Sequence, residues 1–158
     1  MYRHVRILVA EDNEDDRYFL KRAFLKAGIN APMGFVEDGV KAVDYLGGKG
    51  RFRDRTDFPL PQLLIMDLKM PLLDGFGVLK WLRAQPGLCQ LPVLVLSSSE
   101  EPKDVDLAHE LGANGYTIKP SNPGEMRGFI ECVEVYWLKS HSYPSMKSRS
   151  GLRERRRA

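Results

Sequence analysis

The sequence is poor in cysteine and has no long apolar run, and each absence excludes a class of protein. Only two of its 158 residues are cysteine. Cys89 and Cys132 stand in unrelated contexts that match no zinc-binding spacing, so we expect two reduced thiols in the core. No apolar stretch approaches the roughly 18–20 residues that a membrane-spanning helix needs, so we expect no membrane insertion.

The chain also lacks the features of a secretion signal. Residues 1–6 lead directly into a short apolar run, without the longer apolar stretch and small-residue cleavage site of a signal peptide. We therefore expect a cytoplasmic protein. Its length suits one domain with its own core, and its apolar fraction of 43% is that of an ordinary globular protein.

The net charge of +3 is unevenly distributed along the chain. Residues 139–158 hold seven Lys/Arg and one Glu, or +6, which leaves −3 on residues 1–138. We expect one folded domain over 1–138 and a basic, disordered tail over 139–158. The tail could instead contact nucleic acid or anionic lipid. No second folded module accompanies it, so we expect no sequence-specific DNA binding.

Short apolar runs alternate with helical patterns along residues 1–138. Five apolar runs have the length of strands: 5–10, 33–36, 62–67, 91–97 and 115–118. Five segments after them predict helices: about 14–27, 38–46, 75–84, 102–111 and 123–138. The Arg-rich stretch 49–61 predicts a polar loop that faces solvent or a partner. This order predicts an α/β fold, a doubly wound five-stranded parallel sheet with right-handed crossovers.

Polar side chains follow most of the predicted strands, at the point where each strand ends. Glu11 and Asp12 follow the first strand, Asp67 ends the third, Ser97 ends the fourth and Lys119 follows the fifth. The carboxyl ends of parallel strands meet at one edge of such a sheet, where ligands bind. We therefore expect three carboxylates, a hydroxyl and an ammonium to converge there.

This set of groups suits phosphoryl transfer to a carboxylate. Converging carboxylates repel one another unless a cation is present, and oxygen ligands with water are the preference of Mg²⁺. A carboxylate can act as a nucleophile and form an aspartyl-phosphate. A metal ion and a lysine would then offset the charge of the phosphoryl group. Each group alone has an ordinary structural explanation, such as a helix cap, a strand-end hydroxyl or a loop lysine.

Taken together, these motifs resemble the receiver domains of two-component response regulators. The matching residues are Glu11-Asp12, Asp67 to Pro71, Asp74-Gly75, Ser97, Gly112-Ala113, Tyr116 and Lys119-Pro120. The resemblance covers about residues 5–138 and implies the flavodoxin-like receiver fold. The long loop after the second helix is similar to that of stand-alone regulators paired with phytochrome-type histidine kinases.

The resemblance implies a metal site and a phosphoacceptor. Asp67 would take the phosphoryl group from a kinase phosphohistidine. Mg²⁺ would be held by Asp12, by Asp67, by Glu11 through water and by the backbone carbonyl of Lys69. Ser97 and Lys119 would contact the phosphoryl oxygens.

The resemblance also implies a conformational switch and a tuned lifetime. Tyr116 would turn inward when Ser97 moves toward the phosphoryl group, although it could equally be a core aromatic. Lys69 and Ser99 would tune the lifetime of the phosphorylated state. Pro120 would follow a cis peptide bond.

The function that follows is that of a single-domain phosphorelay protein rather than an enzyme. Phosphorylation would switch a contact with a downstream partner, and we expect the region 102–138 to form that contact or a homodimer. A phosphatase of the haloacid dehalogenase type would need a carboxylate at position 69, where this chain has lysine. The alternative that remains is a pseudo-receiver, which binds its partner without phosphorylation.

Overall fold

The computed structural model describes residues 5–144. Within them the strands are β1 (Ile7–Ala10), β2 (Met33–Val36), β3 (Leu63–Met66), β4 (Val93–Ser97) and β5 (Gly115–Ile118). The helices are α1 (Glu14–Lys26), α2 (Gly39–Gly47), α3 (Gly75–Arg83), α4 (Pro102–Glu110) and α5 (Pro123–Cys132). A 3₁₀ turn, η1 (Gly50–Phe52), follows α2, and a π-helical segment, η2 (Val133–Ser140), continues α5.

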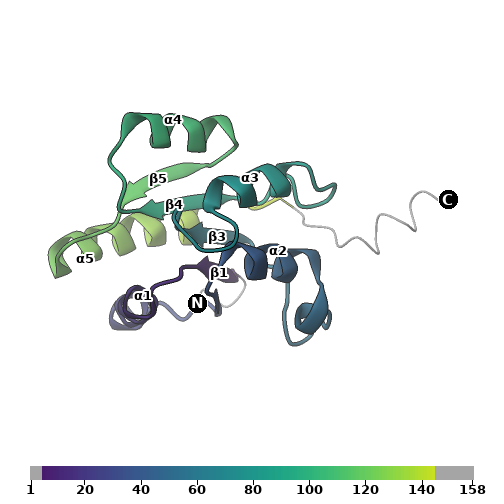
Figure 1. Cartoon of the computed structure of the whole chain (residues 1–158). Helices are drawn as coiled ribbons and strands as arrows, with labels where there is room; N and C mark the ends of the chain where they lie inside the picture. The colour runs from purple at the N-terminus through teal and green to yellow at the C-terminus, as the bar shows by residue number, and fades with distance from the viewer. Residues whose placement is uncertain (1–4, 145–158) are drawn as a thin grey trace.

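The strands form one parallel sheet in the order β2-β1-β3-β4-β5. The chain winds from β1 outward to β2 and then back across β1 to β3, so the order reverses beside β1. Helices α1 and α5 cover one face of the sheet, and α2, α3 and α4 cover the other (Figure 1). This is the doubly wound α/β fold that the sequence predicts, and no helix of residues 5–144 is long and apolar enough to cross a membrane.

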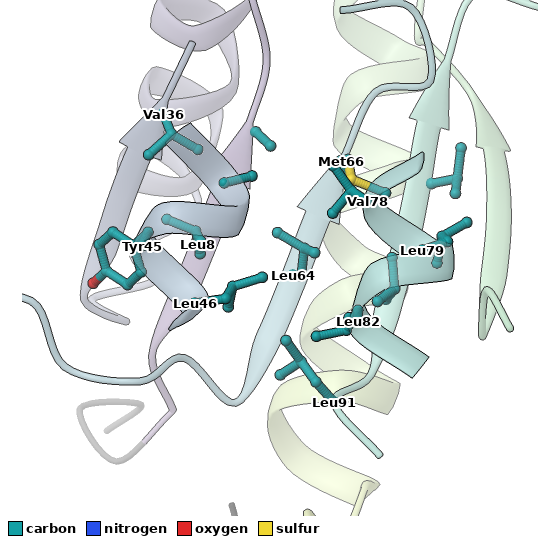
Figure 2. Packing of buried hydrophobic residues seen from close by; sticks show 14 of the residues in the cluster. Leu8, Val36, Tyr45, Leu46, Leu64, Met66, Val78, Leu79, Leu82 and Leu91 are labelled. Carbon is teal, nitrogen blue, oxygen red and sulfur yellow. The ribbon is translucent and has the colours of Figure 1, made fainter. Parts of the chain in front are cut away.

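The central strands are buried on both faces because alternate side chains enter two separate clusters. Leu64 and Met66 of β3 pack toward α3, where they lie beneath Val78, Leu79 and Leu82 (Figure 2). The intervening strand residues enter the second cluster, against α1 and α5. The continuous apolar sequence of β3 follows from this double burial.

The connection from β3 to α3 is held by close backbone contacts. The N–H of Gly75 donates to the carbonyl of Leu68 at 2.8 Å. A Cβ atom at Gly75 would lie 2.6 Å from the carbonyl oxygen of Asp67, so any larger residue would displace this loop. The Asp74 carboxylate caps α3 by accepting from the N–H of Gly77 at 2.9 Å.

The Arg-rich loop 49–61 is more ordered than the sequence predicts. Arg55 is half-buried and donates to the backbone carbonyls of Tyr45, Leu46 and Phe58 at 2.8 to 3.1 Å. Two of these carbonyls lie in the last turn of α2, where helix carbonyls lack the usual N–H partner four residues further on. The rings of Tyr45, Phe52 and Phe58 pack beside it, with centroids 5.1 to 5.9 Å apart. The prediction of a solvated or partner-facing arginine is therefore wrong for Arg55.

Two further expectations concern the cysteines and the tail. Cys89 and Cys132 are both free thiols, as expected, but both are exposed, so their assignment to the core is wrong. The expected domain boundary at residue 138 falls inside η2, which continues to Ser140. Residues 145–158, most of the basic tail, lie outside the described residues, and the division into domain and tail stays a prediction.

Candidate functional site

Asp67 is a buried carboxylate whose position is fixed by its neighbours. It directly follows β3, and its N–H continues the ladder to the carbonyl of Ala10 at 3.0 Å. The side-chain oxygen Oδ1 accepts from the N–H of Leu68 at 2.7 Å and, more weakly, from that of Lys69 at 3.4 Å. Asp67 and Glu11 are each only 5% exposed, which is unusual for carboxylates and requires charged or polar partners.

Glu11, Asp12 and Asp67 together form an acidic cluster at the ends of β1 and β3. Each offers a carboxylate oxygen, and these oxygens lie within 4.8 Å of one another. Glu11 and Asp67 are buried, whereas Asp12 is exposed and leaves one side open to water. Closely spaced oxygen donors with access to water suit a hard divalent cation, so the residues present fit the metal site that the sequence predicts.

Lys119 is the cation that faces this cluster. Its ammonium nitrogen lies 2.8 Å from a Glu11 oxygen, 2.9 Å from Asp67 Oδ2 and 2.9 Å from an Asp16 oxygen. The three contacts use all three N–H donors of the ammonium group. A backbone hydrogen bond of 2.8 Å from Lys119 to the carbonyl of Ser97 holds this residue beside the end of β4.

Asp16 is a site residue that the sequence analysis missed. It lies in the first turn of α1, next to Glu14 and Asp15, in an acidic run that is favourable at any helix N-terminus. Only the direction of its side chain toward Lys119, a residue 103 positions away, distinguishes Asp16 from its neighbours. The composition of the run carries no such signal.

Burial and charge act in opposite directions on the titration of the site. Burial raises the pKa of Glu11 to about 7, and the negative Asp67 adds to this, although Lys119 and the N–H of Asn13 oppose it. Burial alone would lower the pKa of Lys119, but hydrogen bonds with Asp67, Glu11 and Asp16 outweigh it and raise the pKa. Lys119 therefore carries a full positive charge, and Glu11 is easier to protonate than an exposed carboxyl group.

Ser97, Ser99 and Tyr116 are joined in one hydrogen-bonded network. The hydroxyl of Ser97, which is fully buried, accepts from the N–H of Ser99 at 3.2 Å. The Tyr116 hydroxyl donates to the Ser99 carbonyl at 2.9 Å, and the Ser99 hydroxyl donates to Asp104 of α4 at 2.6 Å. Tyr116 is half-buried against the α3 side of the core, so it already lies inward here. The Ser99 hydroxyl is thus bonded to α4, a contact that the sequence did not suggest.

One backbone expectation is wrong. The Lys119–Pro120 peptide bond is trans, as are all peptide bonds described, whereas a cis bond was expected. The trans form is the intrinsically favoured isomer even before proline.

A cavity of about 760 Å³ opens beside the site, between α1 and α5. Asp67 and Lys119 line it together with apolar residues such as Phe19 and Ile130 and charged residues such as Arg127.

The fold and this site define a receiver domain. A profile of the response regulator receiver domain family matches residues 7–131, and the chain belongs to that family. The predicted family and fold are thereby confirmed. The chain is a response regulator receiver of two-component signalling, similar to phytochrome-associated regulators.

Two curated proteins are similar to this chain over most of its length. The response regulator Rcp1 of Synechocystis is 29% identical over 139 residues, which cover 88% of this chain and 92% of the relative. The probable methanogenesis regulatory protein FilR2 of Methanothrix harundinacea is 32% identical over 84% of this chain and 83% of its own length.

Solved structures of response regulators also superpose closely on this chain. A response regulator in red light signalling of R. palustris superposes with a TM-score of 0.85 and 37% identity, over 90% of this chain and 99% of that one. The phosphorylated cyanobacterial phytochrome response regulator RcpA superposes with a TM-score of 0.81 and 29% identity, over 89% and 99%. The Mn²⁺-bound form of Rcp1 gives 0.80 and 28%, also over 89% and 99%.

Proposed function

We propose that Asp67 accepts a phosphoryl group from the phosphohistidine of a sensor histidine kinase. The observation that carries this proposal is the environment of the Asp67 carboxylate, which is buried, fixed by the N–H of Leu68 and in contact with the Lys119 ammonium. A carboxylate held in this way is oriented to attack a phosphorus atom. The Lys119 ammonium can contact the phosphoryl oxygens and offset their negative charge.

The proposed transfer is a displacement at phosphorus. The Asp67 carboxylate forms a new O–P bond while the P–N bond to the histidine breaks, and the imidazole nitrogen leaves with the bonding electrons. Lys119 then contacts a phosphoryl oxygen in place of the Asp67 carboxylate, while Asp16 still holds its nitrogen. Ser97, whose hydroxyl lies at the end of the neighbouring strand, donates to another phosphoryl oxygen.

The acidic cluster would hold a divalent cation, which we propose to be Mg²⁺. Its ligands would be Asp12, Asp67, the backbone carbonyl of Lys69 and Glu11 through water. When bound, the cation offsets the negative charge of the transferring phosphoryl group. The solved structure of Rcp1, a similar receiver, is of a Mn²⁺-bound form, which supports the proposal that this chain binds a divalent ion.

We further propose a phosphoacceptor signalling protein rather than an enzyme with turnover. Its only catalysis would be its own phosphorylation and slow dephosphorylation, with Lys69 and Ser99 affecting the lifetime of the phosphorylated state. The acidic cluster and Lys119 favour this function over that of a pseudo-receiver, because a partner-binding module has no need of them. The cytoplasmic location expected from the sequence stays a prediction.

The partners proposed are a phytochrome-type histidine kinase and a downstream protein. The kinase type rests on the similarity to Rcp1, RcpA and the red-light regulator of R. palustris. Leu107, Ile118, Val135 and Tyr136 are exposed within or beside α4, β5 and α5, so the region 102–138 is the proposed partner or homodimer surface. Light scattering that shows a monomer before and after phosphorylation would exclude the homodimer.

Incubation with acetyl phosphate and Mg²⁺, followed by intact-mass analysis, tests the proposal. Wild type should gain the mass of one phosphoryl group, and removal of Mg²⁺ with EDTA should prevent the gain. Asp67→Asn should gain nothing. Asp74→Asn is the matched control, because it removes a carboxylate from the same loop but keeps the cap on α3. Equal phosphorylation of wild type and Asp67→Asn would refute the proposal.

A further inference from the structure

Leu72, in the loop after Asp67, has a strained backbone. Its φ angle is 69°, and it is the only residue other than glycine with a positive φ among residues 5–144. The N–H of Leu73 donates to the carbonyl of Pro71 at 2.8 Å, which closes a three-residue γ-turn around Leu72. A γ-turn with a positive central φ is rare and strained, and a leucine side chain makes that conformation worse.

The fold explains the turn but not the leucine. The turn directs Leu73 inward, where it packs against the core and leaves no room for a side chain at Gly77. Leu72 itself is 81% exposed, so its side chain gains nothing from packing. Glycine or asparagine would form the same turn with less strain. Packing within the domain therefore does not explain an apolar side chain at this position, whereas a contact with another protein would.

The location of Leu72 indicates what that contact is. The hydrogen bond between Gly75 and Leu68 closes this loop, so the exposed Leu72 lies in a short connection that begins directly after Asp67. The Asp67 carboxylate is only 6% exposed. A protein that carries a phosphohistidine must therefore press against the loops around this recess to bring its phosphorus atom within reach.

We propose that Leu72 is an apolar anchor for the phosphodonor protein. Its side chain would pack against an apolar surface that lies beside the phosphohistidine of that protein. This inference rests on the proposed function of Asp67 and adds a recognition residue to it. The strain at position 72 is then retained because the side chain is desolvated only in the complex. An exposed leucine without a partner is the ordinary alternative.

The test compares a protein donor with a small one. The protein donor is an autophosphorylated phytochrome-type histidine kinase, chosen because it transfers to the wild-type chain, and the small donor is acetyl phosphate with Mg²⁺. Leu72→Asn should slow transfer from the kinase about five- to tenfold, mainly through a higher KM. The rate with acetyl phosphate should not change, and the melting temperature should rise by about 2–4 °C as strain is released.

Two further variants serve as matched controls. Leu72→Met keeps a flexible apolar side chain and should retain kinase transfer. Leu25→Asn removes an apolar residue that is 66% exposed near the C-terminal end of α1, and it should not affect transfer. Unchanged kinase transfer to Leu72→Asn would overturn the inference, as would an equal loss with both donors. Failure of wild type to react with acetyl phosphate would instead count against the proposed function of Asp67.

Discussion

Leu64 and Asp67 are three positions apart, one within β3 and one at its end, and both are buried. Leu64 packs among apolar side chains of α3 and neighbouring strands, so its burial stabilises the fold. Asp67 is buried beside another carboxylate, so its burial has to be offset by Lys119 and backbone N–H groups. The middle of the sheet thus holds the fold together, while its carboxyl edge carries groups that the fold alone would not require.

The largest expected effect lies in the middle of the sheet. Leu64→Ala removes a fully buried side chain and leaves a cavity, which should lower the free energy of unfolding by about 2–5 kcal/mol. Denaturant unfolding measures this loss, and the folded fraction should still be phosphorylated by acetyl phosphate. Leu25→Ala, at an exposed position on α1, should change stability by less than about 0.5 kcal/mol. Equal losses for the two variants would contradict the assignment of Leu64 to the core.

At the carboxyl edge the main effect should be on chemistry. Lys119→Met removes the ammonium that contacts Asp67, so the phosphorylation rate with acetyl phosphate should fall about 100-fold. Lys103→Met removes the same charge from an exposed ion pair on α4 and should leave the rate unchanged. A normal rate for Lys119→Met would show that the lysine has only a structural role.

Arg55 is a charged residue outside the carboxyl edge of the sheet. We expect it to affect the stability of the protein but not the rate of phosphorylation. Arg55→Ala removes three hydrogen bonds to backbone carbonyls, which should lower the free energy of unfolding by about 1–3 kcal/mol. Arg53→Ala, in the same loop but exposed, is the control and should have little effect. Neither variant should change the rate of phosphorylation, and a slower rate in Arg55→Ala would link this loop to the site.

The smallest expected effect concerns the bond between Ser99 and Asp104. A double-mutant cycle with Ser99→Ala and Asp104→Ala should give a coupling energy of about 1 kcal/mol in stability. Asp106→Ala, on the same helix, should show no coupling to Ser99→Ala. If Ser99 and Asp104 prove additive, the β4–α4 loop is not anchored by this hydrogen bond.

The sequence predicts the fold and most of the site because both follow from local patterns. Period and length identify the strands, and the rule that parallel strands present their carboxyl ends at one edge groups Glu11, Asp12, Asp67, Ser97 and Lys119. The structure places Glu11, Asp12, Asp67 and Lys119 together, and links Ser97 to Tyr116 through Ser99. The chemical roles of these residues stay predictions.

The features that the sequence does not predict depend on the direction of single side chains. Asp16 differs from Asp15 only in the side of α1 on which it lies, and Arg55 differs from Arg53 only in its reach to the end of α2. Average burial places cysteine in the core, but Cys132 lies on the outer side of α5. Residue type gives no information about these directions.

The central claim is that Asp67 is the phosphoacceptor and contributes chemistry rather than stability. It is tested most directly by intact-mass analysis of Asp67→Asn and Leu64→Ala, side by side, after incubation with acetyl phosphate and Mg²⁺. We predict no added phosphoryl group on Asp67→Asn, although it unfolds at a denaturant concentration at least as high as wild type. We predict one on the folded fraction of Leu64→Ala. A phosphoryl group on Asp67→Asn would contradict the claim.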